Sequence, residues 1–145
     1  MANVNTVHFY RIALVGIGLI GSSVAHMVRQ RGLAEHIAVT ARSQESLDIA
    51  RRLGIADSVT LDQGEAVTDA DLVMICSPVS TYGAIMETIA PNLKPGAIVT
   101  DVGSVKSAVV RDAVPHIPDG VHLIPAHPVA GTEHSGPEAG FAELF

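Results

Sequence analysis

Short apolar runs alternate along the chain with segments in which apolar residues recur at helical spacing. The apolar runs predict strands at 11–16, 36–41, 58–60, 71–76, 97–101 and 122–125. The helical spacing predicts helices at 19–31, 44–53, 81–89 and 107–114. Strands that alternate with crossover helices form a mostly parallel sheet with helices on both faces. We therefore expect one α/β domain over residues 11–145, preceded by a flexible leader over residues 1–10.

The composition agrees with such a sheet. Hydrophobic residues make up 48% of the chain and aromatic residues only 3%, so the core must consist mainly of aliphatic side chains, as in strands covered on both faces. A length of 145 residues suits one domain. The formal charge of -6 argues against nucleic acid as a partner. The single cysteine, Cys76, cannot form an internal disulfide, so we expect a reducing compartment, the cytoplasm.

Residues 12–25 resemble the apolar part of a secretory signal and end in small residues. The stretch is too short to span a bilayer, three glycines interrupt it, and its helical pattern continues through Met27 and Val28. We interpret it as part of the fold and predict no membrane partner.

The tail has a different pattern. Residues 126–140 contain three glycines and two prolines, which predicts a loop, with a plain surface loop as the default interpretation. Residues 141–145 begin an apolar pattern and do not complete it. We therefore expect the sequence to be the front part of a longer protein.

A glycine-rich segment follows the first predicted strand. It matches GxGxxG with Gly16, Ile17, Gly18, Leu19, Ile20 and Gly21. The pattern is common by itself, but here it lies between an apolar strand and an amphipathic helix, the context that dinucleotide binding requires. Gly16 would permit a tight turn, Gly18 a close approach to a pyrophosphate and Gly21 close packing of helix on sheet. We predict a doubly wound, Rossmann-type fold that binds NAD(P), with a purely structural turn as the alternative.

The end of the second strand bears on the choice of cofactor. An acidic residue there would accept a hydrogen bond from the ribose 2'-hydroxyl of NAD. The sequence has Ala41 at this place, followed by Arg42 and Ser43, which could donate to a 2'-phosphate. The prediction therefore favours NADP over NAD, unless Arg42 is a surface arginine and Ser43 merely caps the next helix.

Two further segments follow predicted strands, CSPV at 76–79 and DVGSVK at 101–106. Open α/β sheets bind ligands at the carboxyl ends of their strands. Three residues are therefore candidates for contacts with the cofactor: Ser77, Pro78 and Ser104. Of these, Ser77 and Ser104 would contact its nicotinamide half. Either serine could instead cap a helix. Cys76 is interpreted as a small buried hydrophobe rather than a reactive thiolate.

One of the seven histidines stands apart. His127 follows the last strand, so it would face the same crevice as Ser104 and could act as an acid or base. His134 lies further along the loop, and the other five are interpreted as surface or structural residues. No spacing of His, Cys and Glu is typical of a zinc site, so we predict no metal.

The segments GIGLIGSS (16–23), CSPV, DVGSVK and HPVAGTEHSGPEAGFAELF (127–145) together closely resemble the amino-terminal domain of prephenate and arogenate dehydrogenases. The resemblance implies NAD(P)-dependent oxidative decarboxylation of prephenate or arogenate in tyrosine biosynthesis. It implies that His127 accepts the proton of the substrate's ring hydroxyl, that Ser104 lies near His127 and the nicotinamide, and that Glu133 lies at the active-site entrance.

The sequence departs from this family in two ways. The family often has Asp where this chain has Ala41, and the helical carboxyl-terminal domain that completes the substrate pocket and a homodimer is not in the sequence. We expect these residues alone to bind the cofactor without turnover. Two alternatives stay open: another dehydrogenase, acting on a β-hydroxy acid, or a non-catalytic module that senses NAD(P).

Overall fold

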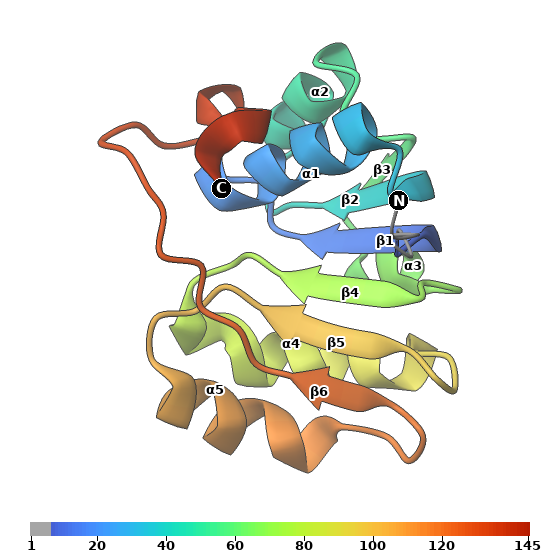
Figure 1. Ribbon diagram of the computed structural model, residues 1–145. Helices are drawn as coiled ribbons and strands as arrows, with labels where there is room; N and C mark the ends of the chain where they lie inside the picture. Colours follow the sequence, from blue (N-terminus) through green and yellow to red (C-terminus); the bar gives the residue numbers. More distant parts are fainter. Residues whose placement is uncertain (1–6) are drawn as a thin grey trace, which may run out of the picture.

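All six strands of the sheet run parallel, in the order β3-β2-β1-β4-β5-β6 (Figure 1). The computed structural model describes residues 7–145. The strands are β1 (Phe9–Val15), β2 (Ala34–Thr40), β3 (Ser58–Thr60), β4 (Leu72–Ile75), β5 (Ile98–Asp101) and β6 (His122–Ile124). The α-helices are α1 (Leu19–Arg31), α2 (Gln44–Arg52), α3 (Gln63–Val67), α4 (Tyr82–Ile89) and α5 (Lys106–Ala113). The Rossmann-type, doubly wound prediction is confirmed.

The central strands are apolar on both faces because helices cover both faces. Ile12 and Leu14 of β1 pack in a core cluster with side chains of α1 and α2. Ala13 and Val15 belong to a second cluster, together with side chains of α3, α4 and α5. Burial of a leucine such as Leu14, which is 0% exposed, contributes about 1.5–3 kcal/mol, so the two layers hold the strand ends firmly in place.

The sheet begins earlier in the chain than the sequence pattern indicates. β1 starts at Phe9, whose backbone N–H donates to the Leu33 carbonyl over 2.8 Å and which lies opposite Ala34 of β2. The leader predicted over 1–10 is therefore wrong for Phe9 and Tyr10, while residues 1–6 lie outside the described residues. At the other end of β1, Gly16 takes a φ of +104° and begins the turn into α1.

The helix α3 was not expected from the sequence. Its five residues make less than two turns, too short for an amphipathic period to appear. The side chain of Asp62 caps it by accepting a hydrogen bond from the Glu65 backbone N–H at 3.1 Å. The cap places Gln63 beside the carboxyl ends of the strands.

The tail forms a loop as predicted, apart from a 3-10 turn at Pro137–Ala139. It runs from β6 past the carboxyl ends of the strands and returns to α1 (Figure 1). The Phe141 backbone N–H donates to Ser23 Oγ over 3.1 Å. Gly140 packs so tightly that a Cβ there would lie 1.9 Å from Ser22 Oγ. The ion pair Arg52–Glu138 ties the same segment to α2. The tail therefore packs against α1 and α2 beside the carboxyl ends of the strands.

Candidate functional site

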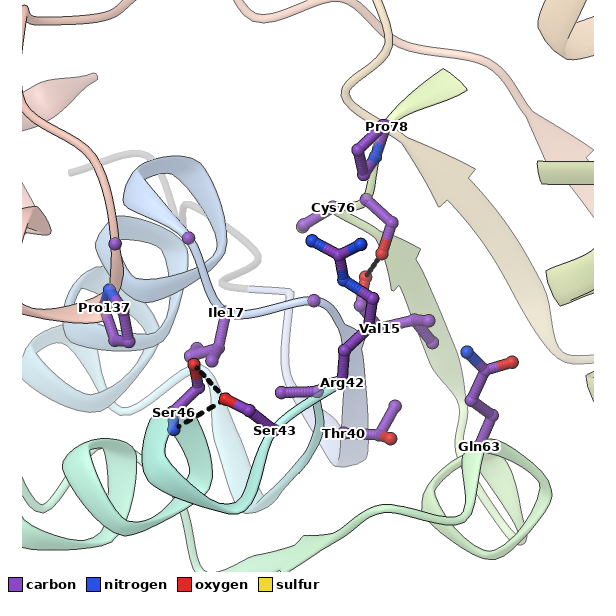
Figure 2. A pocket seen from close by; sticks show the side chains of 15 residues that line it. Val15, Ile17, Thr40, Arg42, Ser43, Ser46, Gln63, Cys76, Pro78 and Pro137 are labelled. Carbon is purple, nitrogen blue, oxygen red and sulfur yellow. Dashed lines mark hydrogen bonds between the residues drawn. The ribbon is translucent and has the colours of Figure 1, made fainter. Parts of the chain in front are cut away.

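A cavity of about 520 Å³ lies where β1, β2 and β4 end, at the switch point of the sheet order (Figure 2). The residues that line it are Val15, Gly16, Ile17, Gly18, Thr40, Ala41, Arg42, Ser43, Ser46, Gln63, Cys76, Ser77, Pro78, Gly136 and Pro137. Among these, Arg42 is the one charged side chain. Arg42 is therefore the one side chain of this lining that offers a positive charge to an anionic group of a ligand.

The glycine turn is closely packed at Gly16 and Gly21 and open at Gly18. A Cβ on Gly16 would lie 2.7 Å from the Cys76 carbonyl oxygen. Gly16 also has a positive φ, which residues with a side chain rarely adopt, so only glycine fits there. A Cβ on Gly21 would lie 2.5 Å from the Gly16 carbonyl oxygen, which shows how closely α1 packs on the turn. Gly18 has no heavy atom within 4 Å of a Cβ position. Its backbone faces open space that a ligand can approach.

The first turn of α1 has backbone N–H groups that donate to no capping side chain. Gly18 is the N-cap, and neither a capping side chain nor an acidic residue in the first turn serves the helix N–H groups. Free N–H groups and the positive end of the helix dipole attract an anion. The open space over Gly18 fits a pyrophosphate, and the cradle as a whole fits a dinucleotide.

The end of β2 shows two different roles for neighbouring residues. Ser43 is the N-cap of α2, where its Oγ accepts from the Ser46 backbone N–H at 3.2 Å. The capping alternative for Ser43 is therefore confirmed, although its side chain also lines the cavity. Arg42 is exposed, and no described residue accepts a hydrogen bond from it or forms an ion pair with it. Figure 2 shows Arg42 between Ser43 and Cys76 on the two sides of the cavity.

The loop after β4 is fixed to β1. The Ser77 hydroxyl donates to the Val15 carbonyl over 3.0 Å, and Pro78, not Ser77, precedes the following 3-10 turn. Ser77 therefore lines the cavity without capping a helix. Burial raises the pKa of the Cys76 thiol to about 12, and the nearby charge of Asp101 adds to the effect. The thiol stays protonated at neutral pH, in agreement with the prediction that it is not a reactive thiolate.

The predicted catalytic residues follow the next two strands of the sheet. Ser104 lies in the loop after β5, and His127 lies in the loop after β6; both are exposed. Val105, not Ser104, is the N-cap of α5, so the capping alternative for Ser104 is wrong. The structure does not join the two side chains by a hydrogen bond, and neither lines the 520 Å³ cavity. Glu133 is exposed further along the tail, where its Oε1 lies 3.4 Å from His134 Nε2.

Eight residues of the cavity wall were not among the predicted cofactor contacts: Val15, Thr40, Ala41, Ser46, Gln63, Cys76, Gly136 and Pro137. Gln63 and Ser46 line it from helices α3 and α2, and Gly136 and Pro137 line it from the tail. The signal for Gln63 was the capping pattern of the preceding Asp62, whereas nothing local indicates that residue 136 returns to the glycine turn. A second cavity of about 310 Å³ continues past Arg42 between α3 and α4. Within residues 7–145, no group of three or more His, Cys, Asp or Glu side chains is arranged to hold a metal.

Comparison with known proteins identifies the domain. The family model described as "Prephenate dehydrogenase, nucleotide-binding domain" matches residues 24–145. The chain belongs to the prephenate dehydrogenase family. It is 42% identical over 137 residues to the cyclohexadienyl dehydrogenase of Zymomonas mobilis, a match that covers 94% of this chain and 46% of the relative.

Solved structures of the family have the same fold. The prephenate dehydrogenase of A. aeolicus in complex with hydroxyphenyl propionate and NAD+ matches with a TM-score of 0.86 and 32% identity, over 97% of this chain and 49% of that one. The arogenate dehydrogenase of Synechocystis matches with a TM-score of 0.84 and 32% identity, over 93% of this chain and 46% of that one. The chain thus spans about half the length of these relatives and corresponds to their nucleotide-binding part.

The described residues contain no helix that combines the length and the apolar character needed to cross a bilayer.

Proposed function

We propose that this domain binds NAD(P)+ and that the longer protein containing it oxidises and decarboxylates prephenate or arogenate in tyrosine biosynthesis. The observation that carries the proposal is the order of features along one edge of the sheet. The cradle for a dinucleotide lies at the ends of β2, β1 and β4, and Ser104 and His127 follow β5 and β6, the next strands in line. A nucleotide whose adenosine lies near Arg42 would direct its nicotinamide toward Ser104.

The residues of the chain divide the work between binding and proton transfer. Gly16, Gly18 and the first turn of α1 hold the pyrophosphate, and Ser77 and Pro78 border the path toward β5. The cofactor, when bound, supplies the hydride acceptor. His127 accepts the proton of the substrate's ring hydroxyl through a neutral imidazole. The substrate then loses carbon dioxide and becomes aromatic.

The proposal assigns NADP as the preferred cofactor. The side chain of Ala41 has no oxygen that could accept from the ribose 2'-hydroxyl of NAD. Arg42 extends beside it with a guanidinium that no described carboxylate neutralises. A guanidinium forms paired, charge-assisted hydrogen bonds with a phosphate. NAD+ in the A. aeolicus relative is consistent with a shared cradle for the rest of the nucleotide.

The remainder of the longer protein completes the site in this proposal. His127, Ser104 and Glu133 are exposed here, so a substrate bound against them would lie open to water on one side. A helical carboxyl-terminal domain would cover that side, contribute cations for the carboxylates of prephenate and form the homodimer. The cytoplasmic location inferred from the lone Cys76 stays a prediction.

The role of His127 is tested in the full-length protein with His127→Asn. We expect kcat to fall by about 10²- to 10⁴-fold, the usual contribution of a positioned base, while NADP affinity changes little. The wild-type rate should also decline at acid pH, since an imidazolium cannot accept a proton.

His134→Asn is the matched control, because His134 lies in the same tail and is likewise exposed. It should leave kcat and the acid limb of the pH profile unchanged. Near-normal kcat for His127→Asn, or loss of the acid limb in His134→Asn instead, would contradict the assignment.

A further inference from the structure

A buried carboxylate connects the two loops that follow β5 and β6. Asp101, the last residue of β5, is 1% exposed. Its Oδ2 accepts from the Gly103 backbone N–H over 2.8 Å and from Lys106 Nζ. The hydroxyl of the fully buried Tyr82 lies 3.4 Å from the same oxygen and shares its one hydrogen between Asp101 and the Ile75 carbonyl, which is 3.2 Å away. Its Oδ1 accepts from the Ala126 backbone N–H over 3.1 Å. Every partner is a donor, so a carboxylate, which only accepts, satisfies all of them.

The two backbone groups that Asp101 binds stand next to the proposed catalytic residues. Gly103 directly precedes Ser104, and Ala126 directly precedes His127. The strands before the two loops are paired, with Thr100 of β5 opposite Ile124 of β6. One side chain therefore spans the gap between the two loops.

The loop after β5 packs closely on the carboxylate. A Cβ on Gly103 would lie 2.7 Å from Val79 Cγ2 and 3.0 Å from Asp101 Oδ2, so any side chain at this position would press on the carboxylate. The ion pair with Lys106, which opens α5, compensates the charge of a carboxylate that has lost its water. The low exposure and the full set of donors make this cluster rigid.

We propose that Asp101 is a positioning residue, which sets the separation of Ser104 and His127 by holding the backbone N–H beside each. The inference rests on the proposed function, because it assigns those two residues to the reaction. Asp101 does not touch the substrate in this proposal and acts through the two loops.

Asp101→Asn separates this role from simple stability. An asparagine has one acceptor oxygen, which would turn toward Gly103, Lys106 and Tyr82, where three donors point. Its amide NH2 would then face the Ala126 N–H, so that hydrogen bond is lost. The variant should keep the β5 loop in place and release the loop that carries His127.

The matched control is Asp71→Asn at the opposite end of the sheet. Asp71 has the same chemistry: it accepts from the backbone N–H groups of Tyr10 and Arg11, at 2.8 and 3.0 Å, and pairs with Lys94. Loss of this carboxylate should lower stability without any effect on the loops after β5 and β6.

The experiment compares these variants in the full-length protein by thermal unfolding, kcat, the Kd for NADP+ and amide hydrogen exchange at Ala126. For Asp101→Asn we expect kcat to fall about 10- to 100-fold, with Kd within twofold of wild type and faster exchange at Ala126. Asp71→Asn should keep kcat and the exchange rate. Asp101→Asn with wild-type kcat, or an equal loss of kcat in Asp71→Asn, would overturn the inference.

A second pair of variants tests the hydrogen bond between Asp101 and the Ala126 N–H if Asp101→Asn does not fold. Ala126 is exposed, so Ala126→Pro removes its N–H and Ala126→Ser retains it without disturbing the core. The proline variant should lose kcat and the serine variant should not; equal activities would contradict the proposal.

If wild type turns over neither prephenate nor arogenate, the proposed function fails. The inference that Asp101 holds the Ala126 backbone N–H is then judged by amide hydrogen exchange at Ala126, which must be slower in wild type than in Asp101→Asn.

Discussion

The open space over Gly18 gives a sharp prediction, because the two ends of α1 each carry a glycine with a different task. Gly18 has an extended backbone, with a φ of -74°, and a Cβ there would meet no atom within 4 Å. Gly32 ends the helix with a φ of 61°, in the left-handed region, and also faces open space. Alanine at either position therefore clashes with nothing in the protein.

The expected effects on stability follow from the backbone. Alanine at Gly18 loses a few tenths of a kcal/mol as an N-cap and recovers about the same by restricting the unfolded chain, so stability should change by less than about 0.5 kcal/mol. Alanine at Gly32 costs about 1–2 kcal/mol for the left-handed conformation, less the same recovery. A net loss of about 1 kcal/mol lowers Tm by about 2–4 °C in a domain of this size.

The expected effects on binding are the reverse. A methyl group on Gly18 would occupy the space over the first turn of α1 that we assign to the pyrophosphate, so Gly18→Ala should weaken NADP+ binding more than about tenfold, or 1.4 kcal/mol. Gly32→Ala should leave Kd unchanged. The assay is isothermal titration of NADP+ into both variants together with thermal unfolding. Wild-type affinity in Gly18→Ala would show that the phosphates do not lie at this turn, and a matching loss in Gly32→Ala would show that helix stability alone explains the effect.

Three further predictions follow from other parts of the domain. Arg42→Ala should weaken NADP+ by about 10- to 150-fold, the equivalent of 1.5–3 kcal/mol, and leave NAD+ nearly unchanged in parallel titrations; equal losses would exclude a 2'-phosphate contact. The hydrogen bond from Lys94 holds the pKa of Asp71 below its ordinary value of 3.8, so this carboxylate stabilises the fold above that pH and the contribution disappears as the pH falls below it. The difference in unfolding free energy between wild type and Asp71→Asn should therefore shrink below about pH 4 in urea titrations, and a constant difference would contradict this. The 145-residue chain alone should bind nucleotide and show no turnover with prephenate or arogenate; measurable turnover would place the substrate site within these residues.

The parts of the fold that the sequence predicted well depend on local pattern. The apolar runs around Leu14 and Val73 are long enough to indicate strands covered on both faces, and the glycines that follow β1 and α1 mark their ends. The start of β1 at Phe9 was missed because its pairing with Ala34 depends on a partner strand, not on the residues beside it.

The candidate site divides in the same way. The glycine turn is predictable because the tight turn, the open space over Gly18 and the close packing at Gly21 lie within six consecutive residues. Pro137 escaped prediction because it reaches the cavity only after the tail has crossed the sheet edge. Asp101 was visible only as the end of a strand, since its partners Tyr82 and Ala126 lie far from it in sequence. Long-range contacts between loops leave no periodic signal.

The central claim is that this domain serves an oxidative decarboxylase, and the stoichiometry of turnover tests it most directly. The full-length protein is incubated with NADP+ and either prephenate or arogenate, and reduced nicotinamide and carbon dioxide are both measured. We predict one of each for every substrate molecule consumed. Reduction without carbon dioxide, as in a dehydrogenase of β-hydroxy acids, or tight nucleotide binding without any reduction, as in a sensing module, would contradict the account.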